Sequence, residues 1–181
     1  MNDDAILKEA MEDVMRFIVK KLRERSERQG HKLTGRLIRS MEFKVNVKSG
    51  VAVGDVYMEH YSQFLERGVR ASRIPFSGRS GRGGTSKYIQ ALADYFKKRG
   101  VPSREVLRAA FATAYKHKRE GMPTRASSRF SQDSGVRTGF ITRTVNESQD
   151  AIITILGDKV TQTILVRIER SFTGGEGVLV I

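Results

Sequence analysis

The stretch with the strongest claim to chemistry is residues 76–87, FSGRSGRGGTSK, which holds four glycines, two arginines and one lysine ahead of a predicted helix. A Walker A phosphate loop needs the pattern GxxxxGK[ST], because its glycines expose backbone N–H groups and its lysine neutralises phosphate. Gly78 and Gly83 have this spacing, but Gly84 stands at the lysine position, and Lys87 comes too late. We therefore expect no nucleotide site in this stretch.

Other catalytic or metal-binding patterns are also missing from the sequence. His31, His60 and His117 lie in separate segments without the i, i+4 spacing of a helical metal pair, and the chain has no cysteine. Glu59 and Glu66 are seven residues apart and read as solvated surface acids, and no GxSxG motif occurs. We expect no catalytic residue, no cofactor and no metal, so the chain is predicted not to be an enzyme.

The positive charge of this sequence is concentrated in its middle third. The net charge of the whole chain is +13, and residues 67–129 alone carry 16 basic and 3 acidic groups, while the segments on either side are close to neutral. This concentration favours an anionic partner, either nucleic acid or an acidic protein face, over a solvated basic surface that only aids solubility. The residues that we expect to contact this partner are Arg70, Arg73, Arg79, Arg82, Lys87, Arg125 and Arg129.

The first third of the chain predicts a helix followed by a hairpin. Apolar residues recur every three or four positions over residues 4–28, which indicates a long amphipathic helix. Residues 41–48 alternate strictly between apolar and polar, and Ser49-Gly50 is a turn signal before the apolar run that follows. An antiparallel hairpin over 41–56 is therefore expected, with a short helix over 57–68 after it.

The rest of the chain predicts two helices and then strands. Helices are expected over 86–99 and 103–120, separated by Gly100 and Pro102. Residues 140–168 are rich in β-branched side chains and are predicted to be strands, with Gly157-Asp158 as a hairpin turn. We thus expect a single α+β domain over 1–181, whose antiparallel sheet joins the 41–56 hairpin to the 140–168 strands, with 69–129 as a basic helical insertion.

Two observations argue against a membrane partner. No apolar run approaches the ~20 residues that a membrane-spanning helix needs. The N-terminal segment is acidic and amphipathic, unlike a signal peptide. We therefore expect a chain that works without contact to a membrane.

Two neighbouring stretches, LTGRLIRSMEFKV and VAVGDVYMEHYSQFLERGV, resemble the neck and tail-completion proteins of long-tailed bacteriophages, the minor tail proteins related to the Z protein of lambda. The family pattern is an LTGxLxxS stretch that enters a hairpin, then a tyrosine-containing helix that ends in a Glu-x-Gly turn. The residues that match it are Leu33, Thr34, Gly35, Leu37, Ser40, Tyr61, Phe64, Glu66 and Gly68. After Gly68 the chain departs from the family pattern, because RIPF opens a Gly/Arg-rich insertion.

This resemblance implies a non-enzymatic structural subunit of a virion. Members of the family form rings of repeated subunits, commonly sixfold, at the head–tail interface, so it implies a homo-oligomer, a hexameric ring, between connector and tail proteins, assembled in the host cytoplasm. Non-specific contact with packaged DNA fits the basic segment. The alternative is a basic, sequence-independent nucleic-acid-binding accessory protein, and an enzyme such as a nuclease ranks third.

Overall fold

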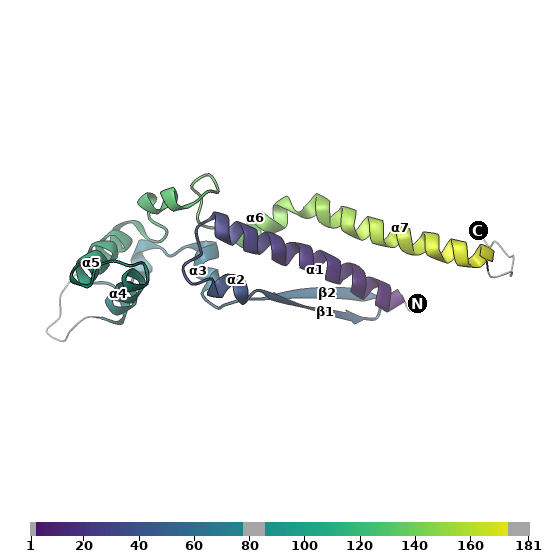
Figure 1. Ribbon diagram of the computed structural model, residues 1–181, viewed down its shortest axis with the longest axis horizontal. Helices are drawn as coiled ribbons and strands as arrows, with labels where there is room; N and C mark the ends of the chain where they lie inside the picture. Colours follow the sequence, from purple (N-terminus) through teal and green to yellow (C-terminus); the bar gives the residue numbers. More distant parts are fainter. Residues whose placement is uncertain (1–2, 78–85, 174–181) are drawn as a thin grey trace. The chain divides into compact units, whose positions relative to one another are not determined.

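The computed structural model describes residues 3–77 and 86–173, and their side chains over 4–77 and 86–165. Its elements, drawn in Figure 1, are α1 (Asp3–Arg28), α2 (Arg36–Arg39), β1 (Glu42–Lys48), β2 (Val51–Tyr57), α3 (Ser62–Arg67), η1 (Ala71–Arg73), α4 (Lys87–Lys98), α5 (Ser103–Glu120), η2 (Arg125–Phe130), α6 (Phe140–Glu147) and α7 (Gln149–Thr173). The α+β class predicted from the sequence is confirmed. None of the described helices is both long enough and apolar enough to cross a membrane.

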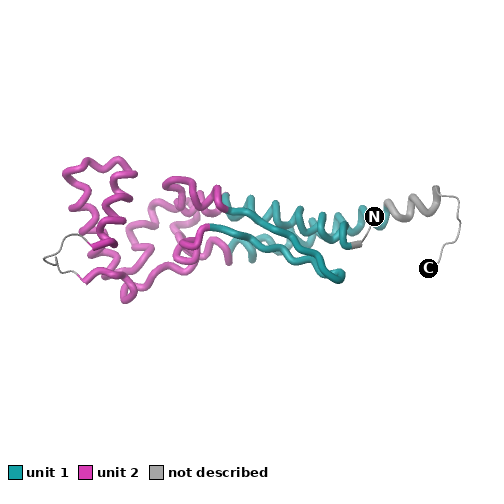
Figure 2. Tube along the Cα trace, turned by 90° about the horizontal axis from the view of Figure 1, so that it is seen from below, with its two compact units in different colours: residues 1–23, 41–58, 143–181 teal, residues 24–40, 59–142 magenta. Residues whose placement is uncertain are grey.

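The chain forms two compact units, coloured separately in Figure 2. Unit 1 consists of residues 1–23, 41–58 and 143–181, and unit 2 of residues 24–40 and 59–142. Helices α1 and α6 each contribute residues to both units. The basic segment 69–129 lies wholly within unit 2, and the expectation that it is an insertion into a single domain over 1–181 stays a prediction.

In unit 1, β1 and β2 form the predicted antiparallel hairpin. Its two strands alternate between exposed and half-buried residues, as the period of two in the sequence requires. Phe43 pairs with Val56 and Val45 with Gly54, so that these residues share the half-buried face. A Cβ added at Gly54 would lie 2.5 Å from the sulfur of Met15, so this glycine leaves the space that a buried side chain of α1 occupies.

The prediction of strands over 140–168 is wrong, because this segment forms α6 and most of α7. Buried side chains recur every fourth residue at Phe140, Thr144 and Ser148, which is a helical period that β-branched composition conceals. The hydroxyl groups of Thr154 and Thr163 donate to the carbonyls four residues earlier, a bond that β-branched threonines make within helices. The described part of the sheet therefore has only two strands.

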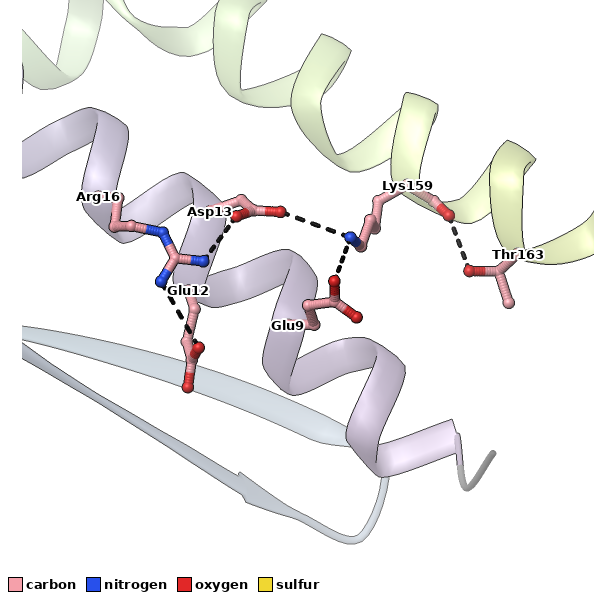
Figure 3. Close-up of polar contacts among 6 residues, drawn as sticks. All are labelled: Glu9, Glu12, Asp13, Arg16, Lys159 and Thr163. Carbon is pink, nitrogen blue, oxygen red and sulfur yellow. Dashed lines mark hydrogen bonds and ion pairs between the residues drawn. The ribbon is translucent and has the colours of Figure 1, made fainter.

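Helix α7 lies beside α1 in unit 1 (Figure 3). Lys159 of α7 donates a hydrogen bond to Glu9 of α1, and its ammonium group lies 3.7 Å from an oxygen of Asp13. Asp13 also accepts a 2.7 Å hydrogen bond from Arg16. The bond from Arg16, followed by the charges of Arg16 and Lys159, holds the pKa of Asp13 below its usual value against the opposing effect of burial.

In unit 2, α4 and α5 confirm the two helices predicted over 86–99 and 103–120. The side chain of Ser86 caps α4 by accepting a hydrogen bond from the backbone N–H of Ile89, at 3.3 Å. The apolar faces of the two helices pack around a buried cluster of Ile74, Phe76, Ile89, Ala93, Val106, Ala110 and Ala114. Because Ile74 and Phe76 follow η1 directly, this cluster anchors the start of the basic segment to the two helices.

Candidate anion-binding surface

The seven arginines and lysines predicted to meet an anionic partner all belong to unit 2. Arg79 and Arg82 lie outside the described residues. The other five, Arg70, Arg73, Lys87, Arg125 and Arg129, are exposed and come from the segment around η1, the start of α4 and the 3-10 helix η2. The predicted contact residues that the structure describes are therefore available to a partner.

A two-bond backbone bridge brings the segments of Arg70 and Arg125 together. Val69 and Met122 each donate a backbone hydrogen bond to the other, at 2.7 and 2.8 Å. Gly68 and Gly121, the residues before them, have φ angles of +70° and +82°, a conformation that side chains disfavour. The bridge places the start of η1 next to the chain that leads into η2, with Arg70 one residue and Arg125 three residues beyond it.

Two of the remaining described candidates, Arg73 and Lys87, are each next to a residue that contacts the C-terminal end of α5. Lys118 of α5 donates a 3.4 Å hydrogen bond to the carbonyl of Ile74, which follows Arg73 directly. The hydroxyl of Tyr88, next to Lys87, is hydrogen-bonded to Nδ1 of His117 at 2.7 Å. Burial raises the pKa of Tyr88 and lowers the pKa of His117, which favours the neutral form of both side chains. The His117 side chain therefore serves packing, and the lysines and arginines around it provide the charge.

Charge separates sharply between the two units. Unit 2 contains 22 basic and 8 acidic residues, a net charge of +14, whereas unit 1 contains 11 basic and 12 acidic residues, a net charge of −1. The excess extends beyond the segment 67–129 singled out in the sequence, because 24–40 contributes five basic and two acidic residues. An anionic partner would therefore be attracted to unit 2 as a whole.

A polar network around the end of α1 holds this basic unit in shape. Arg137 donates hydrogen bonds to the backbone carbonyls of Gln29, Gly30 and Ser127, at 3.1 to 3.4 Å. Asp133 accepts from Arg28 at 3.0 Å and from the buried side chain of Gln29 at 2.9 Å. The bonds from Arg137 to Gln29 and Gly30 satisfy carbonyls at the end of α1 that no helical N–H reaches.

Arg137 also acts on its neighbours through its charge. Burial, followed by repulsion from Arg99, lowers the pKa of Arg137, although arginine stays charged at any physiological pH. Burial, followed by the charge of Arg137, lowers the pKa of His31 to about 4. His31 is therefore neutral at pH 7, and the positive charge near the end of α1 belongs to the arginines and lysines.

The residues that carry the family resemblance all lie in unit 2. The hydroxyl of Ser40 donates to the carbonyl of Leu37 at 2.8 Å and accepts from the backbone N–H of Glu59 at 3.1 Å. The carboxylate of Glu66 accepts hydrogen bonds from the backbone N–H groups of Ile141 and Thr142, at 2.7 and 3.2 Å, and so caps α6. These motif residues thus have roles in holding the unit together.

Three other motif residues, Leu33, Tyr61 and Phe64, remain exposed to solvent. Their exposed surfaces are available to a partner. Sequence reasoning did not place Lys98, Arg99 and Arg137 in the candidate set, although all three are basic. Nothing in their spacing relates Arg137 to the end of α1, which is 107 residues earlier in the chain.

Among the described residues, no cluster of three or more histidine, aspartate or glutamate side chains is placed to hold a metal ion. Comparison with protein-family models, curated proteins and solved structures finds no match to this chain.

Proposed function

We propose that this chain is a non-enzymatic structural subunit of a bacteriophage virion, which assembles into a ring at the neck between head and tail. Unit 1 would provide contacts between subunits, and unit 2 would meet an anionic neighbour, either packaged DNA or an acidic face of a connector or tail protein. The family resemblance of Leu33–Gly68 supports this assignment. An exposed surface of α7 supports the self-association that a ring requires.

That surface is an apolar stripe on α7, which we define as Ile153, Gly157, Val160 and Ile164. The spacings of four, three and four residues put these positions on one helix face. Ile153, Val160 and Ile164 are 67%, 49% and 51% exposed, and a Cβ at Gly157 would meet nothing within 4 Å. Exposed apolar residues at this spacing suit packing against a helix of another subunit, because the association removes their surface from water.

A ring forms when the same two patches meet head to tail and the rotation closes. The test is the mass of the purified full chain by light scattering after size exclusion, with electron microscopy of the particles that form. We expect a closed ring for the native sequence and a monomer for the variant Val160→Lys/Ile164→Lys. Gln162→Lys, an exposed change on the opposite face of α7, is the matched control and should still form rings.

The second candidate is a sequence-independent nucleic-acid-binding accessory protein, which the net charge of +14 on unit 2 favours. The two proposals differ in where the chain ends up. A stoichiometric ring of this chain in purified virions would support the structural role. Salt-sensitive binding of a 30-base-pair DNA by a monomer that is absent from virions would support the accessory role instead.

The basic segment can be tested separately from the ring. Charge reversal at Arg79, Arg82 and Lys87 should leave the fold intact and reduce either assembly or DNA retention in particles. Unchanged infectious particles would count against a role for this segment, while leaving the role of α7 unaffected.

A further inference from the structure

Unit 2 contains a half-open cavity of about 420 Å³ that none of the roles above uses. The segment after α1, helix α2 and the end of α4 contribute to its walls. One part of the wall is aliphatic and consists of Leu33, Leu37 and Leu65, and Tyr61 and Tyr95 add aromatic rings. The cavity is therefore built to accept an apolar group.

The same cavity is strongly basic. Five of its 14 lining residues are arginine or lysine, and none is aspartate or glutamate. Two of the five are neutralised from outside the cavity, since Lys32 pairs with Glu27 and Arg36 pairs with Glu59, both at 2.7 Å. The other three are Lys98, Arg99 and Arg137.

Those three cations have no carboxylate partner among the residues that the structure describes. Arg99 donates a 3.1 Å hydrogen bond to the hydroxyl of Tyr95, and its guanidinium lies 5.5 Å from the centre of that ring. Arg137 donates to backbone carbonyls. Arg99 and Arg137 line the same cavity as Lys98, so one anion bound there can meet all three cations. The charge of Arg99 also contributes to the lowered pKa of Arg137, after the larger effect of burial.

We propose that this cavity binds an acidic segment of another protein. An aspartate or glutamate carboxylate of that segment lies among Lys98, Arg99 and Arg137, and a neighbouring aliphatic side chain packs against Leu33, Leu37 and Leu65. The carboxylate relieves the repulsion between the cations and forms charge-assisted hydrogen bonds. The inference concerns the isolated chain and does not depend on ring formation.

The cavity suits a peptide better than a nucleic acid. Nucleic-acid sites combine a basic groove along the backbone with aromatic faces on which bases stack. Here the guanidinium of Arg99 lies over the ring of Tyr95, and the ring of Phe96 meets Tyr95 edge-on with 5.2 Å between centroids. The cations gather at one cavity, and the three leucines offer a surface for an aliphatic side chain.

The test measures binding of two fluorescein-labelled peptides to the full chain by fluorescence anisotropy. One peptide contains Gly-Leu-Glu-Glu-Leu-Gly, and the other replaces both glutamates with glutamine. We expect the acidic peptide to bind at least about tenfold more tightly than its amide counterpart, because only carboxylates pair with the three cations. Lys98→Gln/Arg99→Gln should reduce this preference at least about fivefold.

Arg137 is left unchanged in this design, because its bonds to the end of α1 make its loss a folding defect. The matched control is Arg104→Gln/Arg108→Gln, which removes the same charge from exposed positions of α5 outside the cavity. Circular dichroism checks that both variants are folded. The control should keep the preference for the acidic peptide.

Three outcomes would overturn the proposal. The first is equal binding of the two peptides, and the second is equal weakening by the cavity variant and the control, which would indicate a general effect of net charge. The third uses the oligonucleotide dT12 as competitor. The cavity is a nucleic-acid site if dT12 displaces the acidic peptide and if Lys98→Gln/Arg99→Gln weakens the binding of dT12 more than the binding of the peptide.

Discussion

Unit 2 buries the charged side chains Arg25 and Asp133, whereas unit 1 buries no charged side chain among its described residues. The core of unit 1 consists mainly of apolar side chains of α1, and its ion pairs, such as those of Lys159, lie at the surface. Buried hydrogen bonds require fixed geometry, because a buried polar group that loses its partner is costly. We infer that specific polar contacts hold the basic unit 2 rigid and that unit 1 depends on packing.

The largest effect should come from breaking the polar network of unit 2 at Arg137. Arg137→Ala removes the side-chain donor for the backbone carbonyls of Gln29, Gly30 and Ser127. We expect a loss of about 3 kcal/mol in the free energy of unfolding, since hydrogen bonds to charged groups contribute strongly. Hydrogen exchange followed by mass spectrometry should show faster exchange over 24–40 and 125–142.

The control for this change is Arg108→Ala, an exposed arginine of α5 in the same unit. It removes the same charge and should leave hydrogen exchange as in the native chain. Equal effects of Arg137→Ala and Arg108→Ala would mean that net charge, and not the polar network, sets the stability of unit 2.

A packing change should have the next largest effect, and it acts on unit 1. Gly54→Ala places a methyl group 2.5 Å from the sulfur and 2.7 Å from Cγ of Met15. We expect the free energy of unfolding to fall by about 2 kcal/mol, measured by urea denaturation, because an overpacked core must shift. In a Met15→Ala background the same change should cost almost nothing, and a double-mutant cycle measures this coupling.

Gly157→Ala is the opposite case in the same unit. Nothing lies within 4 Å of the added Cβ, and the residue is inside α7, so we expect a gain of about 0.5 to 1 kcal/mol. If Gly54→Ala and Gly157→Ala changed the free energy of unfolding by the same amount in the same direction, the effect at Gly54 would come from the backbone and not from Met15.

The elements that could be predicted from the sequence are those whose local signals agree with their packing. Helix α1 has a clear apolar period, the hairpin alternates strictly, and Gly100 and Pro102 separate α4 from α5. Residues 140–168 could not be predicted in the same way, because their β-branched composition favours strands. The cap of α6 comes from Glu66, 75 residues earlier, and no local pattern contains that contact.

The candidate surface was partly predictable for a similar reason. Charge is a sum over residue types, so the basic middle segment is visible without knowledge of the fold. The cavity depends on residues that lie far apart in the chain, from Leu33 to Arg137, and only the folded unit brings them to one place. The sequence therefore shows where positive charge is concentrated, but it does not show which residues come together around the cavity.

The pH dependence of stability should also reflect unit 2, through His31. Its pKa is held at about 4 in the folded chain, against an ordinary value of 6.5. As the pH falls from 6.5 to 4, the unfolded chain takes up a proton that folded His31 does not, so stability is lost in this window. After allowance for its partial exposure, we expect His31 to account for a loss of about 1 to 2 kcal/mol.

His31→Gln removes this proton uptake, so its free energy of unfolding should fall less between pH 7 and pH 4 than that of the native chain. Urea denaturation at four or five pH values measures both profiles. Parallel profiles would show that His31 has the same pKa in the folded and the unfolded chain, and that burial beside Arg137 does not act on it.

The smallest effect should follow from loss of the ion pairs between α7 and α1. Lys159→Met removes the contacts with Glu9 and Asp13, and screening by solvent makes exposed pairs of this kind weak. We expect hydrogen exchange in α7 to change only slightly, and the difference from the native chain to disappear in 1 M NaCl. Lys20→Met, at an exposed lysine of α1, controls for the added apolar side chain. If Lys159→Met exposed α7 as strongly as Arg137→Ala exposes the network of unit 2, unit 1 would also depend on specific polar contacts, and the contrast between the two units would fail.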